Sequence, residues 1–181
     1  MKKIILGVVV GILVIGFFVA VYHGAFYKVA IAEKVVGPYT IIYKENTGDY
    51  AKVGTVYAKM NKEMVDVGIS TNQAIGVYYD DPKLVEKEQQ RSDLGYIVKT
   101  ADVKKMTVLR EKGYKTKLIR RPLALPVAEF PYKNQLSVMM GIFKVYPKVE
   151  AYINENKIET VDAVIEIYDI EAKKIMYIID K

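Results

Sequence analysis

The tetrapeptides VYYD at residues 77–80 and EIYD at residues 166–169 decide the fold, because each ends a strand-like run with the same Tyr-Asp pair. Each also follows a long segment with helical periodicity. Repetition of one pattern over such a distance indicates a duplicated supersecondary unit. We therefore expect an α+β fold, in which two tandem strand-helix-strand-strand units, about residues 26–100 and 114–181, form one antiparallel sheet with two helices on one face.

Two segments repeat apolar residues every three or four positions, which gives an α-helix one buried stripe. The first helix is expected at about residues 49–67, with Thr47 or Asp49 as its cap, and the second at about residues 135–154. We expect both stripes to face the core. They comprise Tyr50, Val53, Tyr57, Met60 and Met64 in the first helix, and Leu136, Met139, Phe143, Tyr146 or Val149, and Ile153 in the second.

Runs rich in β-branched and aromatic residues predict the strands. We expect extended segments near residues 26–36, 39–43, 74–79, 94–98, 118–130, 161–168 and 173–180. The Gly37-Pro38 pair separates the first two, and a charged connection at residues 100–113 joins the two units.

Residues 4–22 form an uncharged apolar run that would be roughly 28 Å long as a helix, about the thickness of the hydrocarbon core of a bilayer. A cleaved signal peptide is the alternative, since two lysines precede the run and the Ala-Ile-Ala at residues 30–32 imitates a cleavage site. The run exceeds the usual apolar length of a signal peptide. We therefore predict a single-pass transmembrane anchor at residues 1–25, in contact with the lipid bilayer, and a ligand-binding domain at residues 26–181.

The lysines on the two sides of this run bear on its orientation. Lys2 and Lys3 lie before it and are matched by Lys28 and Lys34 after it, but the first pair is closer to the run and is reinforced by the α-amino group. The predicted localisation is therefore a membrane, with the N-terminus in the cytoplasm and the domain on the extracytoplasmic side.

The chain carries 27 Lys and Arg against 21 Asp and Glu, a net charge of +6 spread along the sequence. Interspersed charges are typical of a solvated surface, so nucleic acid is not predicted as a partner. The sequence has no cysteine, and His23 is its only histidine, which excludes disulfides, thiolate metal sites and a histidine-based triad or zinc site. The acidic residues between 80 and 93 alternate with basic ones and lack EF-hand spacing. Neither a metal nor a cofactor is predicted.

The strand around residue 166 places a carboxylate between apolar neighbours. Two-residue alternation puts Glu166 and Tyr168 on one face and Ile165 and Ile167 on the other. Such a glutamate is either solvent-facing or salt-bridged, or it forms the charged floor of an aromatic pocket for flat cationic ligands, since an unpaired buried charge is costly. We expect this pocket on the sheet face away from the helices or at the seam between the units.

Several motifs resemble those of one known family. They are GVYYDDPKLVEKEQQRSDLGYIV at residues 76–98, Gly37-Pro38-Tyr39, and IEIYDI at residues 165–170. Together they resemble the GyrI-like small-molecule-binding domain, which occurs in gyrase-inhibitor-type proteins and as the drug-sensing domain of multidrug-responsive transcription regulators. The resemblance covers about residues 28–180 and implies the same two-unit fold.

The resemblance also implies the site. Glu166 would be the pocket glutamate that meets cationic ligands, Tyr168 would line that pocket, and Tyr79 would be the first-unit counterpart of Tyr168. The implied function is non-enzymatic capture of hydrophobic or cationic small molecules. Two alternatives stay open: hydrolysis of a reactive electrophile, as in some family members, with Glu166 as general base, and a membrane-surface scaffold for an unknown protein partner. No helix-turn-helix segment precedes the domain, so direct control of DNA is not expected.

Overall fold

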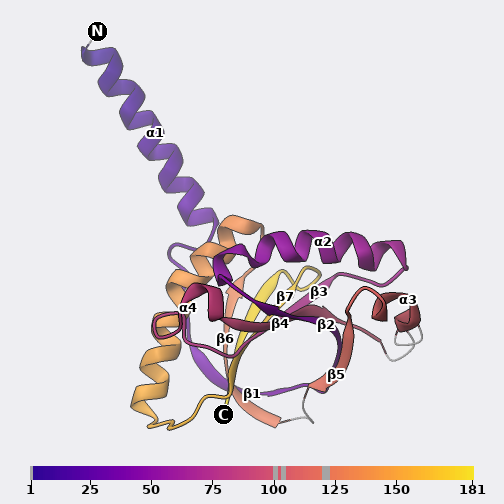
Figure 1. Ribbon diagram of the computed structural model, residues 1–181. Coiled ribbons are helices and arrows are strands. Elements are labelled where there is room, and N and C mark those ends of the chain that lie inside the picture. Colours follow the sequence, from indigo (N-terminus) through magenta and orange to yellow (C-terminus); the bar gives the residue numbers. More distant parts are fainter. Residues whose placement is uncertain (1, 100–101, 103–104, 120–122) are drawn as a thin grey trace.

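Helices and strands follow the predicted order along the chain in the computed structural model, which describes residues 2–99, 102, 105–119 and 123–181 (Figure 1). The predicted connection 100–113 and extended run 118–130 lie partly outside the described residues. The helices and 3-10 turns are α1 (Lys2–Tyr22), η1 (Tyr50–Lys52), α2 (Val53–Asp66), η2 (Lys87–Gln89), α3 (Met106–Arg110) and α4 (Gln135–Glu155). The strands are β1 (Ile31–Val36), β2 (Tyr39–Thr47), β3 (Gln73–Tyr78), β4 (Arg91–Ile97), β5 (Lys115–Ile119), β6 (Leu123–Pro131), β7 (Ala163–Asp169) and β8 (Lys174–Asp180).

Within the described residues, the strands form one curled antiparallel sheet in the order β1-β6-β8-β7-β3-β4-β2-β5 (Figure 1). Its centre consists of two copies of the same arrangement, β6-β8-β7 and β2-β4-β3, which meet where β7 pairs with β3. Each copy has its helix, α4 or α2, between its first and second strands. The predicted α+β fold of two joined units is confirmed.

The two outer strands extend the sheet at its ends, and one of them pairs with the other unit. β1 precedes the first unit in sequence but pairs with β6 of the second, and β5 follows the first unit and pairs with β2. The sequence analysis placed the strand near residues 26–36 at the start of the first unit. In the structure this strand instead extends the sheet beside the second unit, because a distant partner supplies its hydrogen bonds.

α2 and α4 cover one face of the sheet (Figure 1). α2 packs Met60 and Met64 onto β2 and β4, so its predicted buried stripe is confirmed. The first turn is capped as expected, since the Asp49 carboxylate accepts a hydrogen bond from the Ala51 amide. The opposite face of the sheet holds a separate apolar cluster that includes Ile165 and Ile167.

α4 is rotated relative to the sequence prediction. Leu136, Met139 and Phe143, which were expected in the core, are 40%, 48% and 72% exposed. The buried face instead consists of Ser137, Val138, Gly141, Val145 and Val149. The physical reason is close packing: a Cβ at Gly141 would overlap the hydroxyl of Tyr177, so only a glycine lets the helix approach β8 this closely.

The cap of α4 supports the same rotation. The Asn134 side chain accepts hydrogen bonds from the Leu136 and Ser137 amides, and the Ser137 hydroxyl is within reach of the Asn134 amide in return. This capping box holds Ser137 on the inner side of the first turn. The first half of the predicted apolar stripe therefore faces outward, whereas its second half, with Val149, Tyr146 and Ile153, packs against the core as predicted.

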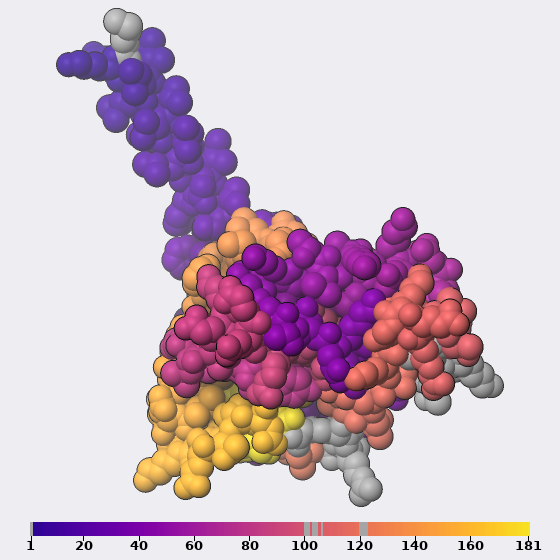
Figure 2. Space-filling model, viewed as in Figure 1, coloured from indigo at the N-terminus to yellow at the C-terminus, as the bar shows by residue number. Residues whose placement is uncertain are grey.

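α1 extends from the domain as an isolated helix (Figures 1 and 2). It is the one helix in the described part of the chain that is long and apolar enough to cross a membrane, and none of its hydrophobic window is buried. A signal sequence has the same properties, so length and composition establish an apolar N-terminal helix of either kind.

Candidate functional site

Glu166 lies at the centre of β7, and its side chain is 3% exposed. The predicted alternation places Ile165 and Ile167 in the apolar cluster of the opposite face, so Glu166 points toward the helix layer. The expected position of Glu166 away from the helices is therefore wrong, and Glu166 lies on the helix side of β7, opposite Gly76 of β3 where the two units meet. Alternation predicts which residues share a face, but it carries no information on which face the helices cover.

Tyrosine hydroxyls satisfy the Glu166 carboxylate. Tyr146 of α4 donates to Oε1 at 2.7 Å, and Tyr168, two residues further along β7, donates to Oε2. Among the described residues no lysine, arginine or histidine forms an ion pair with Glu166. Burial raises the pKa of Glu166, and the hydrogen bonds from Tyr168 and Tyr146 act in the opposite direction.

Further tyrosines enclose this carboxylate. Burial raises the pKa of Tyr57, Tyr78, Tyr146 and Tyr168 well above the ordinary value, and the negative charge of Glu166 adds to the rise in each case. Their hydroxyls therefore stay protonated and remain hydrogen-bond donors. The result is a carboxylate inside an aromatic cage whose polar edges can accept or release hydrogen bonds without changing charge.

Gly76 makes room for this arrangement from the neighbouring strand. It is the register partner of Glu166 across the β3–β7 pair, and a Cβ at Gly76 would lie 2.7 Å from the ring of Tyr78. The Tyr78 ring thus covers the space that a larger residue would fill.

A cavity of about 250 Å³ lies between α2 and the start of α4, next to this cage. Tyr57 and Tyr168 of the cage also line this cavity, and the ring of Tyr168 makes edge-to-face contacts with Tyr57 at 6.3 Å and with Tyr132 at 6.4 Å between centroids. Glu166 itself does not line the cavity, and the hydroxyl of the lining residue Tyr168 donates a hydrogen bond to its carboxylate. The full lining consists of Val53, Gly54, Tyr57, Ala58, Asn61, Thr71, Ala74, Tyr96, Tyr132, Gln135, Val138, Tyr168 and Ile170.

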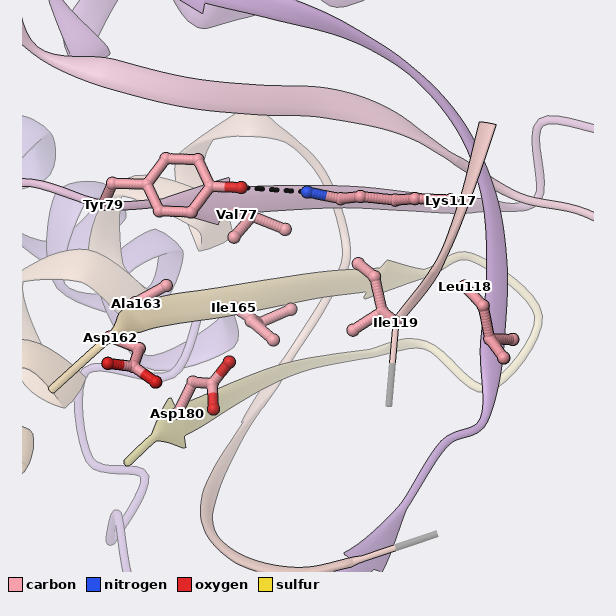
Figure 3. Close-up of a pocket in the computed structure, with 9 residues that line it drawn as sticks. All are labelled: Val77, Tyr79, Lys117, Leu118, Ile119, Asp162, Ala163, Ile165 and Asp180. Atoms are coloured by element: carbon pink, nitrogen blue, oxygen red, sulfur yellow. Dashed lines mark hydrogen bonds between the residues drawn. The ribbon is translucent and has the colours of Figure 1, made fainter. Parts of the chain in front are cut away.

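Tyr79 is not brought to this site. Its hydroxyl donates to the Asp93 carboxylate at 2.7 Å, and the Lys117 ammonium binds both groups. Tyr79 and Lys117 border a second cavity of about 320 Å³ on the opposite face of the sheet, which Ile165 and Asp180 also line (Figure 3).

The register explains this difference. Matching the Tyr-Asp pairs by letter equates Tyr79 with Tyr168, but Tyr78 and Gly76 are the residues of β3 that share a face with Glu166. A shift of one residue moves a side chain to the other side of a sheet. Tyr78, not Tyr79, is therefore the tyrosine of β3 that lies on the same face of the sheet as Tyr168.

The sequence analysis did not assign Tyr57 and Tyr146 to the site, although both were in the predicted helical stripes. A signal was available, because a tyrosine within an apolar stripe brings a hydroxyl that needs a buried partner. Tyr57 donates to the Ile75 carbonyl at 2.8 Å, and Tyr146 donates to Glu166. Two such tyrosines on different helices predict a polar group beneath the helix layer.

The acidic stretch after β3 is a structural turn. The Arg91 guanidinium pairs with Asp80 at 2.7 Å and holds the pKa of that carboxyl below its usual range. The described residues contain no group of three or more potential metal ligands.

A duplicated sheet, a helix layer on one face and a cavity at the seam define the class of two-unit α+β domains that bind small molecules. The chain belongs to the family described as the GyrI-like small molecule binding domain, whose model matches residues 30–177. The resemblance drawn from the motifs at residues 76–98 and 165–170 is thereby confirmed.

Solved structures share this fold. EcmrR in its DNA complex aligns with a TM-score of 0.59 at 9% identity, over 98% of this chain and 67% of that one. The EcmrR C-terminal domain aligns with a TM-score of 0.54 at 11% identity, over 86% and 99%. SAV2435 bound to tetraphenylphosphonium aligns with a TM-score of 0.50 at 14% identity, over 84% and 92%.

Two curated proteins are similar in sequence. Testis-expressed protein 264 from Homo sapiens and its homolog from Mus musculus are each 27% identical over 124 residues. The match covers 66% of this chain and 38% of each relative, so it involves well under half of their length.

Proposed function

We propose that this protein captures amphipathic or cationic small molecules at the seam between α2 and α4, with Glu166 as the counter-charge and Tyr168 as the residue that admits the ligand. The observation that carries the proposal is the state of Glu166, a 3% exposed carboxylate held only by tyrosine hydroxyls within the described residues. A cation that reached it would replace hydrogen bonds of neutral donors with an opposite charge in a medium of low dielectric constant.

Tyr168 provides the route. It separates the cavity from the carboxylate, and its ring already contacts Tyr57 and Tyr132. Rotation of this one side chain would join the cavity to the aromatic cage around Glu166. Aromatic faces then stack on a flat ligand and attract its positive charge.

We also propose that α1 is a single-pass anchor and that the domain lies on the extracytoplasmic side of the membrane. The apolar length of α1 and the position of Lys2 and Lys3 support this arrangement. A reporter enzyme that is active on only one side of the membrane, fused after Lys181, tests the orientation. Activity on the cytoplasmic side would overturn it.

The binding experiment uses the full chain in detergent micelles and tetraphenylphosphonium, the cation held by SAV2435. Calorimetric titration should show saturable binding, and Glu166→Gln should weaken it by about tenfold or more, a loss of about 1.4 kcal/mol. Asp93→Asn is the matched control, since Asp93 is also buried but lies on the other face of the sheet. Its affinity should equal that of the unchanged protein.

Two results would contradict the proposal. Equal affinities for the unchanged protein and Glu166→Gln would remove the role of the carboxylate. Recovery of chemically altered ligand, with turnover of more than one equivalent, would replace capture with hydrolysis and make Glu166 a general base.

A further inference from the structure

The outward stripe of α4 lies beside the end of α1. The Lys133 ammonium donates to the Tyr22 carbonyl at 2.6 Å and lies 3.5 Å from the centre of the Tyr22 ring, and Lys144 donates to the Ala25 carbonyl. Both lysines flank the stripe, Lys133 just before α4 and Lys144 one residue after Phe143. The first turns of α4 are therefore tied to the point where the chain leaves α1.

The segment after α1 is also apolar at its surface. Phe26 is 68% exposed, and its ring packs against Phe17 of α1 at 5.9 Å, so it lies alongside the last turns of that helix. Leu136, Met139 and Phe143 are exposed apolar side chains on the stretch of chain between Lys133 and Lys144, the two lysines that contact the end of α1. An exposed run of large apolar side chains next to a membrane-type helix marks a surface that water does not cover in the working protein.

α2 adds positive charge to the same side. It runs across the side of the domain from which α1 projects (Figure 1), and Lys59 and Lys62 are exposed on it, with Asp66 at its end. Surfaces that bind anionic lipid headgroups combine lysines with exposed apolar residues.

We infer that this face, formed by Leu136, Met139 and Phe143 on α4 with Lys59 and Lys62 on α2, rests on the headgroup layer of the membrane that α1 crosses. The inference rests on the anchoring proposed above and adds to it a second contact. The apolar side chains enter the interface, and the lysines bind anionic headgroups beside them. A single helix would leave the domain free to tumble, whereas this surface holds it in one orientation.

The absence of cysteine from the sequence makes the test direct. Met139→Cys and Phe143→Cys each place one spin label on the stripe of the full chain, in vesicles of phosphatidylcholine with or without phosphatidylserine. Leu118→Cys is the control, because Leu118 is 64% exposed on β5 at the far edge of the sheet. At the stripe, the ratio of label accessibility to oxygen over that to a water-soluble nickel chelate should be several-fold higher than at Leu118.

Phosphatidylserine should raise this ratio further, and the double change Lys59→Gln with Lys62→Gln should abolish that increase while leaving α1 inserted. Carbonate extraction reports insertion separately. A chain that stays in the vesicles with labels as water-accessible as the control overturns the surface but leaves the anchor intact. If the labels are shielded from both oxygen and the nickel chelate, and the protein can be cross-linked as a dimer, the face contacts a second copy of the chain. This result also overturns the proposed membrane contact. A chain released by carbonate overturns the anchor and this surface together.

Discussion

Glu166 and Asp93 are both buried carboxylates that accept a hydrogen bond from a tyrosine, but they lie on opposite faces of the same sheet and are neutralised differently. Asp93 has an ion pair with Lys117 in addition to the Tyr79 hydroxyl. Glu166 has hydroxyl donors alone within the part of the chain that the structure describes. The charge of the Asp93 carboxylate is balanced by Lys117, whereas the charge of the Glu166 carboxylate would be balanced by a bound cationic ligand.

The comparison shows that an acid, a tyrosine and a cavity do not by themselves make a cation site. Both faces have all three features, and the cavity beside Tyr79 is the larger one. The two carboxylates differ in whether a positively charged side chain is their partner. A carboxylate that already has a lysine gains little from a ligand cation, whereas one held by neutral donors in a desolvated site gains a full charge interaction.

The largest expected effect concerns the glycines on the two faces. Gly95→Ala should cost about 3 kcal/mol, because its Cβ would overlap the Ile42 carbonyl of the adjacent strand backbone. Gly76→Ala should cost about 1 kcal/mol, because the obstacle is the Tyr78 ring, which can move. Thermal unfolding of the full chain in micelles, followed by circular dichroism, checks the order. Equal losses would indicate that the Tyr78 ring is as fixed as backbone.

The next effect concerns the ion pair between Lys117 and Asp93. Lys117→Met should destabilise the protein by about 2 kcal/mol, less than for a fully buried pair, because it leaves Asp93 without its cation while Lys117 is 29% exposed. Lys115→Met is the control, since its pair with Glu45 is open to water and should matter less. The same unfolding measurement distinguishes them, and equal losses would refute the claim that burial sets the cost.

A smaller effect is the pH dependence of stability that Glu166 causes. Because burial raises the pKa of Glu166, the folded protein keeps this proton to higher pH than the unfolded chain does. Stability should therefore fall, relative to Glu166→Gln, as the pH rises from the unfolded value of about 4.3 through the folded pKa. Unfolding of both proteins over this pH range measures the difference, and a constant difference would contradict the raised pKa.

Glu129 provides a control of opposite sign. Lys34 and Lys174 lower its pKa, so the stability that it contributes is present above about 4.3 and is lost as the pH falls through the folded pKa. The difference between the unchanged protein and Glu129→Gln should shrink on acidification. If both stability differences changed in the same direction with pH, the cause would be the overall response of the protein to acid and not the individual carboxylates.

The smallest effect is expected at Tyr79. Tyr79→Phe removes one of the two donors to Asp93 but leaves Lys117 in place, so the loss of stability should be about 0.5–1 kcal/mol. Affinity for tetraphenylphosphonium should not change, because Tyr79 lies on the face opposite Glu166. A clear loss of affinity in the calorimetric titration would restore the pocket role that the sequence assigned to this residue.

Local periodicity predicted much of the fold. The stripe of α2 and the alternation around Glu166 follow from residue spacing, and both are confirmed. The inner face of the first turns of α4 was not predictable from hydrophobicity, because it includes Ser137 and Gly141 beside Val138, and a hydrophobic pattern scores serine and glycine as neutral. Close packing against Tyr177 and Phe130 selects that face, and this preference depends on the partner strands.

Long-range pairing explains the other differences. Nothing in the local pattern of residues 31–36 indicates that they pair with β6, because the partner lies far along the chain. The predicted match of Tyr79 with Tyr168 was wrong by one residue for a similar reason. Aligning two sequence motifs does not show which face of the sheet each side chain occupies. On α4, the first half of the predicted stripe is exposed, and the second half packs against the core as predicted.

The cavity between α2 and α4 belongs to the same helix layer that is tied to the end of α1. Under the anchoring that we propose for α1, a lipophilic cation that partitions into the bilayer would be concentrated near this domain relative to bulk water. Occupancy would then follow the partition coefficient as well as the contacts in the pocket. Compounds with equal fit but different lipophilicity would load the protein to different extents.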